Sequence, residues 1–550
     1  MSQNWIEFKE NFYFDNKTEF SIDLGNIGIN KEVKKDFEKK FEKVFKDMQA
    51  LESGSIANPD ENRMVGHYWL RTPSLAPNNE IKECIEKTIK DIKEFANNVH
   101  SGKIVSSTGK NFDTLLLIGI GGSALGPQFL SNALTSKNDK MQVFFFDNTD
   151  PDGMQKTLDK IPNLETTLCV VISKSGGTKE TRNGMLIAEK ALKDSNLDYT
   201  KHFVAVTCEG SNLDKTAHSE NWLQTFPMWD FVGGRTSETS VVGLLPAALQ
   251  GFNIDEFLAG AAYMDSLTRK NEFSNNPAAL LSMVWYVAGD GKGKKDMVIL
   301  PYKDRLELFS KYLQQLIMES LGKKEDRDGN FVYQGISVYG NKGSTDQHAY
   351  IQQLRDGLDN FFVTFIEVLS AKASVASTDK MCKFQVEDNV DSGDYLFGFY
   401  QGTQIALTEG GKKSCTITIK ELSPFTIGML IALFERTVGF YATLININAY
   451  HQPGVEAGKK AAAKILDLKL KIESLLEKEG TPQSLEDIAF KLDENQNMAV
   501  VYRILRHLEA NGKIKDDGEV LIFDRKYSKK WEDASKNTAL FESNANLAVR

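Results

Sequence analysis

The chain is short of the residues that mark secreted, zinc-binding and nucleic-acid-binding proteins. Its 550 residues include five cysteines, an odd number scattered without a C-x-x-C pair. This usage favours a reducing compartment and argues against a familiar zinc cluster. Positive charge is not in excess, since 66 Lys and Arg stand against 75 Asp and Glu, for a net charge of -9. General binding to nucleic acids is therefore disfavoured, whereas a local phosphate site is compatible with this balance.

A signal peptide and a long uninterrupted apolar run are also missing. The first residues, MSQNWIEFKENFYFD, contain acidic side chains and no apolar core, so we expect no signal peptide. Residues 423–448 are strongly apolar, but Glu435 and Arg436 interrupt them. Because charge is costly inside a bilayer, we expect a buried core helix there and no membrane span. These features predict a cytoplasmic protein.

Length and composition are those of a globular protein with more than one domain. The apolar fraction of 41% and the charged fraction of 26% are typical of soluble proteins, and the length suits two or three domains. We expect a mainly helical N-terminal segment packed on the core, two α/β domains of which the second carries an insertion near 370–420, and a C-terminal extension. The expected ranges are 1–105, 106–275, 276–467 and 468–550.

Apolar strands and helical segments alternate from Thr114 onward. This alternation predicts an α/β fold with parallel sheets flanked by helices. The strands expected in the first unit are 114–120, 141–146, 166–173 and 202–208. The second unit has expected strands at 297–301, 336–339 and 361–369 and an expected helix at 304–320. Ligands of such sheets bind outside the carboxyl ends of the strands.

A loop rich in hydroxyl groups and glycine follows one of these strands. Residues 173–181, SKSGGTKET, lie between an apolar strand and a helical pattern. The N-terminus of a helix has unpaired N–H groups and a positive dipole end, so it favours an anion. The hydroxyls of Ser173, Ser175, Thr178 and Thr181 can donate to phosphate oxygens. The alternative for the loop alone is a solvated turn with an ordinary N-cap.

Four further stretches each carry one residue suited to acid–base or charge chemistry. Arg235 follows two glycines, Glu319 lies near a helix end, His348 closes a loop, and Lys459 lies at the start of a helix. Taken singly, Arg235, Glu319 and Lys459 are compatible with solvated surface charges, and His348 with a structural histidine. A second glycine turn, residues 121–123, ends another strand, so it can converge with the 173–181 loop on one ligand.

Together, six strings resemble the glucose-6-phosphate isomerase family, also called phosphoglucose isomerase. In chain order they are IGIGGSALGP, SKSGGTKET, VGGRTSETS, MESLGK, GSTDQHAYIQQ and QPGVEAGK. They have the family's order and comparable spacing over roughly residues 114–464. The resemblance implies two sugar-isomerase-type domains, each a parallel sheet flanked by helices. It also implies the interconversion of glucose 6-phosphate and fructose 6-phosphate, a step of glycolysis and gluconeogenesis, without a metal or an organic cofactor.

The resemblance assigns four catalytic residues. Glu319 is the carboxylate that moves a proton between C2 and C1 of the sugar. Arg235 stabilises the negative charge of the cis-enediolate formed between the two transfers. His348 and Lys459 open the sugar ring, with His348 as the main acid. In this family the histidine loop comes from the partner subunit, so a homodimer with His348 acting in trans is implied.

Substrate contacts are implied in the same way. The four hydroxyl residues match the phosphate contacts, and Lys174 adds charge nearby. Gly122 and Ser123 match the glycine turn that lines the sugar. Gln315 lies one helical turn before Glu319, and it matches a pocket position, as does Gln452. Ala124, Leu321 and residues 344–346 differ from the family's usual residues, but none of these changes removes a catalytic group.

Residues after about 468 extend past the usual end of the family. A helix at 484–492, a turn, a helix at 498–509 and a strand at 519–523 resemble a winged-helix domain. Its charges are mixed, with Arg503 and Arg506 among acidic neighbours. DNA-reading domains usually carry a clear basic surface, so we favour packing or protein contact for the extension.

Two other function classes remain open. A regulator that senses a sugar phosphate would join the phosphate domain to a helix-turn-helix tail, but it has no use for proton-transfer groups. An aminotransferase acting on sugar phosphates would normally need a glutaminase part with a nucleophilic cysteine at the start, whereas the first cysteine here is Cys84. The joint presence of Glu319, His348, Arg235 and Lys459 favours the isomerase.

Overall fold

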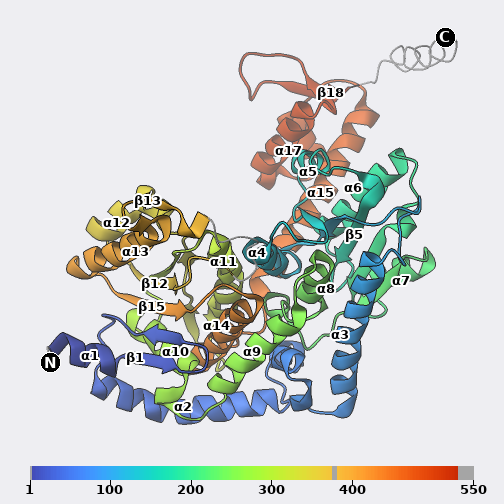
Figure 1. The fold of residues 1–550 in the computed structure, drawn as a ribbon. Coiled ribbons are helices and arrows are strands. Elements are labelled where there is room, and N and C mark those ends of the chain that lie inside the picture. Colours follow the sequence, from blue (N-terminus) through green and yellow to red (C-terminus); the bar gives the residue numbers. More distant parts are fainter. Residues whose placement is uncertain (1–2, 374–380, 531–550) are drawn as a thin grey trace. The chain divides into compact units, whose positions relative to one another are not determined.

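The computed structural model describes residues 3–373 and 381–530. The chain divides into two compact units, Met1–His451 and Gln452–Arg550. Unit 1 contains two large sheets, of five and six strands, covered by helices (Figure 1). The predicted α/β fold with parallel sheets flanked by helices is confirmed.

The first sheet of unit 1 has five parallel strands in the order β4-β3-β5-β6-β7. The strands are β3 (Thr114–Ile118), β4 (Gln142–Phe146), β5 (Thr167–Ile172), β6 (Phe203–Thr207) and β7 (Gln224–Pro227). The four strands predicted from the sequence are confirmed, and β7 is an addition. Every residue of β5 is buried, as expected for a strand covered on both faces.

Helices flank this sheet on both sides (Figure 1). Alternate residues of β5 enter different core clusters: Val170 packs in the cluster that includes α8, and Val171 packs in the cluster that includes α6. This alternation follows from the two-residue period of a strand. The helices are α4 (Leu125–Leu134), α5 (Pro151–Leu158), α6 (Lys179–Asp194), α7 (Asn212–Ser219) and α8 (Val241–Gln250).

The second sheet has six strands in the order β1-β2-β15-β12-β8-β11. Its last four strands are parallel to one another, and β1 and β2 are antiparallel additions at one edge. The strands are β1 (Phe12–Asp15), β2 (Phe20–Asp23), β8 (Asp296–Pro301), β11 (Val338–Tyr339), β12 (Phe361–Val368) and β15 (Ser414–Ile419).

Two parts of this sheet differ from expectation. The insertion expected near 370–420 is wrong for residues 414–419, because they form β15 between β12 and β2. The N-terminal segment is not only helical, since β1 and β2 extend the second sheet, with Ile22 opposite Ile417. Both differences involve the pairing of β2 with β15, segments hundreds of residues apart, which local periodicity does not report.

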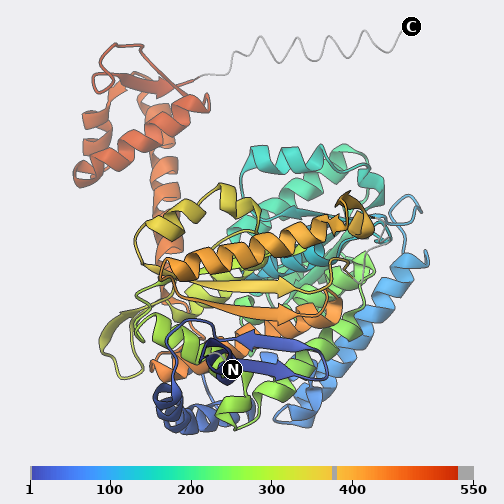
Figure 2. The ribbon, with the colours of Figure 1, turned by 60° about the vertical axis from the view of Figure 1, so that its left-hand side comes forward.

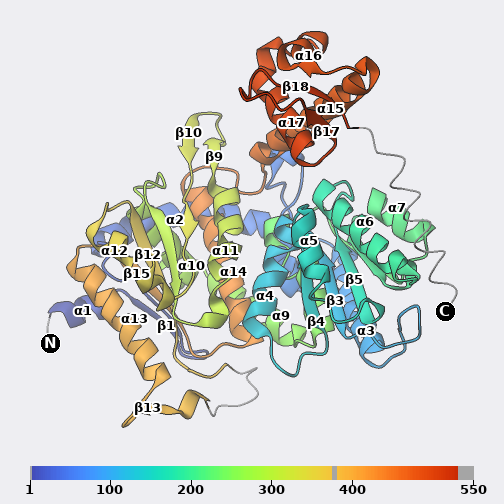
Figure 3. The same ribbon diagram turned by 90° about the horizontal axis from the view of Figure 1, so that it is seen from above.

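The helix expected at 304–320 is broken into shorter pieces. A single turn, η9 (Asp304–Leu306), is followed by α11 (Phe309–Leu313) and then by η10 (Gln314–Glu319), which is π-helical. Single π-helical turns are rare and are frequently found at functional sites. Glu319 is the last residue of η10, and a hairpin of β9 (Lys323–Glu325) and β10 (Phe331–Gln334) follows and projects from the unit (Figure 3).

Other helices complete unit 1. The long helix α13 runs along the second sheet (Figure 2), and its Tyr400 and Leu407 pack in one cluster with residues of β8 and β12. The remaining helices of this part are α9 (Ile254–Thr268), α10 (Pro277–Ala288), α12 (Ile351–Asp356), α13 (Ser392–Glu409) and α14 (Pro424–Leu444). The N-terminal helices are α1 (Gln3–Glu10), α2 (Lys31–Glu52) and α3 (Asn79–His100).

Helix α14 is the core helix expected at 423–448. Among the described residues one helix, α14, is long and apolar enough to cross a membrane, but 89% of its most apolar window is buried inside the protein. Arg71 forms ion pairs with Glu435 of α14 and with Asp265 of α9, all of them buried. Paired charges of this kind are tolerated in a protein core, so the prediction of a core helix is confirmed.

Unit 2 is a small helical domain with a three-stranded sheet. Its elements are α15 (Pro453–Glu479), β16 (Gln483–Ser484), α16 (Leu485–Lys491), α17 (Met498–Ala510), β17 (Ile514–Asp516) and β18 (Lys526–Lys529). The strand expected at 519–523 is wrong, because these residues connect β17 and β18 without forming a strand. Val520, Leu521 and Phe523 are of types that favour strands, but their side chains are exposed. Strand propensity depends on packing against neighbouring strands, and these residues have little such packing.

Candidate active site

The hydroxyl-rich loop lies at the carboxyl end of β5, as predicted. Ser173 and Thr181 are buried, and their hydroxyl oxygens have no hydrogen-bond partner within the described part of the chain. Ser175 is exposed, and its Oγ accepts a hydrogen bond of 3.2 Å from the N–H of Gly177. Buried hydroxyls without partners are uncommon in native proteins. They therefore indicate a place that a polar ligand fills.

The start of α6 adds backbone donors to this loop. Thr178 is the N-cap of α6, and no side chain caps this end among residues 3–373 and 381–530. The first N–H groups of the helix therefore remain available to an anion. Gly176 has φ of +65°, and a Cβ there would lie 2.4 Å from the backbone N of Leu213. Only glycine allows this loop to approach α7 so closely.

The glycine turn at 121–123 packs directly on the turn that carries Arg235. A Cβ on Gly122 would lie 2.2 Å from the carbonyl oxygen of Gly234, so the two backbones touch. The Ser237 hydroxyl donates to the carbonyl oxygen of Gly234 at 2.7 Å. Ser123 closes the short turn η4 (Gly121–Ser123). The sequence predicts that the turn at 121–123 converges with the 173–181 loop, which stays a prediction, whereas its contact with the Arg235 turn is seen only in the structure.

Arg235 and Glu319 form a pair at the centre of the site. The Nε of Arg235 lies 4.0 Å from Oε2 of Glu319, and their side chains are 5% and 19% exposed. The Nη2 of Arg235 donates to the carbonyl oxygen of His451 at 3.3 Å. Burial lowers the pKa of the Arg235 guanidinium, while the carboxylates of Glu319 and Glu61 act against this shift. Arginine nevertheless stays charged at neutral pH, so a fixed cation faces a partly exposed carboxylate.

Gln315 links the glutamate segment to the glycine turn. It lies on η10 four residues before Glu319. A Cβ on Gly121 would lie 3.2 Å from Nε2 of Gln315, so this amide reaches the turn at 121–123. Gln315 therefore lies at the turn 121–123, and its place in the substrate pocket stays a prediction.

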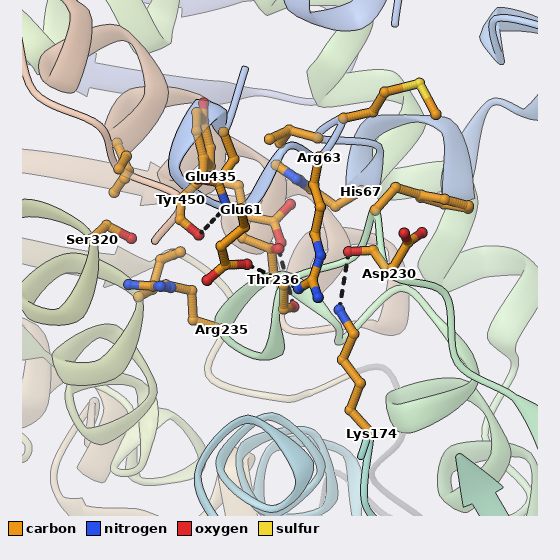
Figure 4. A pocket seen from close by; sticks show the side chains of 18 residues that line it. Glu61, Arg63, His67, Lys174, Asp230, Arg235, Thr236, Ser320, Glu435 and Tyr450 are labelled. Atoms are coloured by element: carbon orange, nitrogen blue, oxygen red, sulfur yellow. Dashed lines mark hydrogen bonds and ion pairs between the residues drawn. The ribbon is translucent and has the colours of Figure 1, made fainter. Parts of the chain in front are cut away.

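Lys174 points away from its own loop. Its Nζ donates to the carbonyl oxygens of Asp230 at 3.0 Å and Val232 at 2.9 Å, and Figure 4 shows the side chain reaching toward Asp230. Burial and the charge of Arg63 lower the pKa of Lys174. In this structure Lys174 ties the 173–181 loop to the segment that leads into Arg235.

A pocket opens beside these residues (Figure 4). Side chains of Lys174, Arg235 and Ser320 line it together, so the hydroxyl loop, the arginine turn and the glutamate segment share one cavity. Several charged residues of the pocket have no assigned role in the sequence analysis: Glu61, Arg63, Asp230 and Glu435. They lie outside the six strings or inside apolar segments, and no local pattern marks them.

Of the predicted site residues, His348 does not line this pocket, and Gln452 and Lys459 belong to unit 2. His348 is exposed on η11 (Thr345–His348), and no hydrogen bond or ion pair joins it to Arg235 or Glu319 in the described part of the protein. Its loop is held by buried Asp346, which accepts a hydrogen bond of 2.8 Å from the N–H of Asn341. Gln452 and Lys459 belong to unit 2, where they are exposed at the start of α15.

Metal ligands are not clustered. In residues 3–373 and 381–530, no group of three or more His, Cys, Asp or Glu side chains is arranged to hold a metal ion. All five cysteines are free.

Comparison with known proteins gives one consistent result. The phosphoglucose isomerase family model matches residues 23–396 and 399–482. A glucose-6-phosphate isomerase of a Geobacter species is 54% identical over 536 residues, covering 96% of this chain and 99% of the relative. One from a Nostoc species is 54% identical over 508 residues, covering 92% and 95%. The crystal structure of a glucose-6-phosphate isomerase from Chlamydia trachomatis has a TM-score of 0.73 at 27% identity, covering 85% of this chain and 91% of that one.

Proposed function

This chain belongs to the phosphoglucose isomerase family, and from that premise we propose how its residues divide the reaction. The protein interconverts glucose 6-phosphate and fructose 6-phosphate, the aldose–ketose isomerisation of glycolysis and gluconeogenesis. The similarity over nearly the whole chain carries this conclusion. None of the relatives named above is a regulator, so the sensor alternative has no support from them.

A coupled assay tests the activity. Purified protein is given fructose 6-phosphate, and glucose 6-phosphate is detected through its oxidation, with EDTA present throughout. We expect turnover of about 10 per second or more, typical of enzymes of central metabolism, and no loss with EDTA. Absence of turnover would favour the sensor, and loss of activity in EDTA would contradict a reaction without a metal.

The Glu319 carboxylate is the proton carrier in our proposal. Isomerisation removes a proton from C2 and delivers one to C1, and a single carboxylate can do both. Its 19% exposure and its place beside the pocket support this role. The guanidinium of Arg235, buried and 4.0 Å away, then stabilises the negative charge of the cis-enediolate.

The phosphate group of the substrate occupies the 173–181 loop in our proposal. The unpartnered hydroxyls of Ser173 and Thr181 and the uncapped start of α6 support this placement. Ser175 and Thr178 complete the set of donors. Gly122, Ser123, Gln315 and Gln452 then contact the sugar, and Lys174 holds the loop in position through the carbonyls of Asp230 and Val232.

Removing two of the loop hydroxyls should weaken substrate binding. We expect Ser175→Ala with Thr178→Ala to raise KM by about a hundredfold or more, because each lost hydrogen bond to a charged group costs about 1.5–3 kcal/mol and about 1.4 kcal/mol is tenfold in binding. Turnover at saturation should change little. Ser195→Ala, at the opposite end of α6, is the matched control, since its hydroxyl donates to the nearby backbone carbonyl of Ala191 in the same helix. An unchanged KM in the double variant would contradict the placement of the phosphate in this loop.

Ring opening is assigned to His348 and Lys459, with His348 supplied by a partner subunit. The exposure of His348 supports this arrangement. Exposed aromatic side chains lie close by, because Gln347 donates a hydrogen bond to the carbonyl oxygen of Phe399, and Phe397 and Phe399 are exposed on α13. An apolar surface beside a catalytic loop suits a subunit interface. We therefore propose a homodimer.

The ranges 106–275 and 276–467 are proposed as the two sugar-isomerase-type domains, and 1–105 as the segment packed on them. The five free cysteines and the sugar-phosphate substrate suit a cytoplasmic location. Purification in the membrane fraction or with a disulfide would contradict this location.

Residues 468–550 are proposed as a winged-helix-like extension that contacts protein. Helices α16 and α17 and the β17–β18 pair support the likeness. Arg506 and Arg525 form ion pairs with Glu509 and Asp516, so part of the basic charge of this unit is neutralised. The alignment with the Geobacter relative covers 96% of this chain. Most of the extension is therefore part of the aligned region. Salt-sensitive binding of the protein to DNA at micromolar concentration would contradict a protein-contact role.

A further inference from the structure

Lys323 is a buried lysine beside the catalytic pair, and none of the roles above uses it. It is the first residue of β9 and is 5% exposed. Lysine is almost never this deeply buried unless it is paired. Its burial next to a reactive carboxylate therefore needs a reason.

The hydrogen bond of Lys323 supplies that reason. Its Nζ donates to the backbone carbonyl oxygen of Glu319 at 2.7 Å. This carbonyl belongs to the last turn of the helical segment, where carbonyl groups lack partners within the helix. The neighbouring carbonyl, that of Met318, accepts from the N–H of Gly322 at 2.8 Å. The chain just after Glu319 thus folds back and holds the end of η10.

The surroundings of Lys323 contain charges of both signs. Arg235 from η7 (Gly234–Thr236) is the nearby cation, and Glu319 and Asp60 are the nearby carboxylates. His451 from the loop after α14 also interacts with Lys323, and burial lowers the pKa of this histidine. Burial, together with the charge of Arg235, lowers the pKa of Lys323 to about 7, and the two carboxylates act against this shift. The ammonium form of Lys323 is therefore lost as the pH rises through about 7.

We propose that Lys323 is a positioning residue that fixes the turn carrying Glu319, so that the carboxylate reaches C1 and C2 of the bound sugar. This inference rests on the proposed role of Glu319 as proton carrier. A charged donor forms a stronger hydrogen bond than a neutral one, and displacement of a catalytic group by about 1 Å can lower the rate about a hundredfold. Lys323 acts through Glu319 and does not touch the substrate.

The test compares Lys323→Met with Lys324→Met in the full-length protein. Lys324 is next in the chain, its side chain is 61% exposed, and its ion pair with Glu325 is on the surface, so it is the matched control. We expect Lys323→Met to lower kcat by about 10- to 100-fold with KM changed by less than about threefold. Lys324→Met should match the wild type. A kcat for Lys323→Met within twofold of the control would overturn the proposal.

A second background shows whether Lys323 acts through Glu319. The effects of substitutions at residues that act together are not additive. Adding Lys323→Met to Glu319→Gln should therefore lower the residual rate no further. A full additional loss in the double variant would assign Lys323 an independent role and overturn the proposal. If Glu319→Gln alone keeps near-normal turnover, the proposed function of Glu319 fails instead, whatever Lys323 does.

The pH dependence of the wild type gives a readout that does not depend on the variant folding. The profile of kcat/KM reports ionisations of the free enzyme. We expect kcat/KM to be highest below about pH 7 and to fall about three- to tenfold above it, as the ammonium form of Lys323 is lost. This fall is the limb that we assign to Lys323. Lys323→Met should lack this limb. A wild-type profile that is flat through this range, or a limb shared by both proteins, would overturn the proposal.

Discussion

Replacing Glu319 with glutamine should lower turnover by about three orders of magnitude or more while substrate binding stays nearly intact. Glutamine keeps the size of the side chain and can still accept a hydrogen bond, but it cannot accept and return a proton. Arg235 stays in place in this variant, since its hydrogen bond to the carbonyl oxygen of His451 does not involve Glu319. The loss should therefore fall on kcat and leave KM within a few fold.

The matched control is Glu325→Gln. Glu325 lies six residues on, and its side chain is 51% exposed and forms a surface ion pair with Lys324. Both variants are measured in the coupled assay in both directions, together with exchange of the substrate's C2 proton with solvent. Near-normal turnover or proton exchange in Glu319→Gln would remove Glu319 from the role of proton carrier.

Mixing two inactive variants should restore activity if His348 acts across a subunit interface. In a dimer of one Glu319→Gln chain and one His348→Ala chain, one site receives both intact residues and the other receives neither. Random exchange of equal amounts should therefore recover about a quarter of the wild-type activity, since half of the dimers are mixed and each has one intact site. Each variant alone should be nearly inactive.

The control for mixing places both substitutions in one chain. When the doubly substituted chain exchanges with the wild type, each site of a mixed dimer lacks one of the two intact residues. The activity of the mixture should therefore fall below that of the wild-type protein it contains. The mass in solution, from light scattering, reports whether the protein is a dimer. A mixture of the single variants that stays inactive after complete subunit exchange would assign His348 to the site of its own chain.

The residues named from the sequence fall into two groups in space. Ser173, Thr181, Arg235 and Glu319 come from three segments, and Lys174, Arg235 and Ser320 of these segments line one pocket. His348 lies outside this pocket on an exposed turn. Strand ends and helix starts have local signatures, such as an apolar run followed by glycine and hydroxyl residues, so the loops were open to prediction. The separation between His348 and the pair depends on how the domains fold together, which no local pattern reports.

The sequence by itself determined the alternation of strands and helices, the loop chemistry at the ends of the strands, and the family, because these depend on short-range periodicity and on residue types at fixed spacing. The tertiary structure alone decided that β1, β2 and β15 join one sheet, that the amine of Lys174 turns to the carbonyls of Asp230 and Val232, and that Lys323 is buried against Glu319. Burial and long-range pairing depend on which distant segments meet. The sequence MESLGK is the same whether its lysine, Lys323, is solvated or buried. Only the neighbours of Lys323 in space reveal its role.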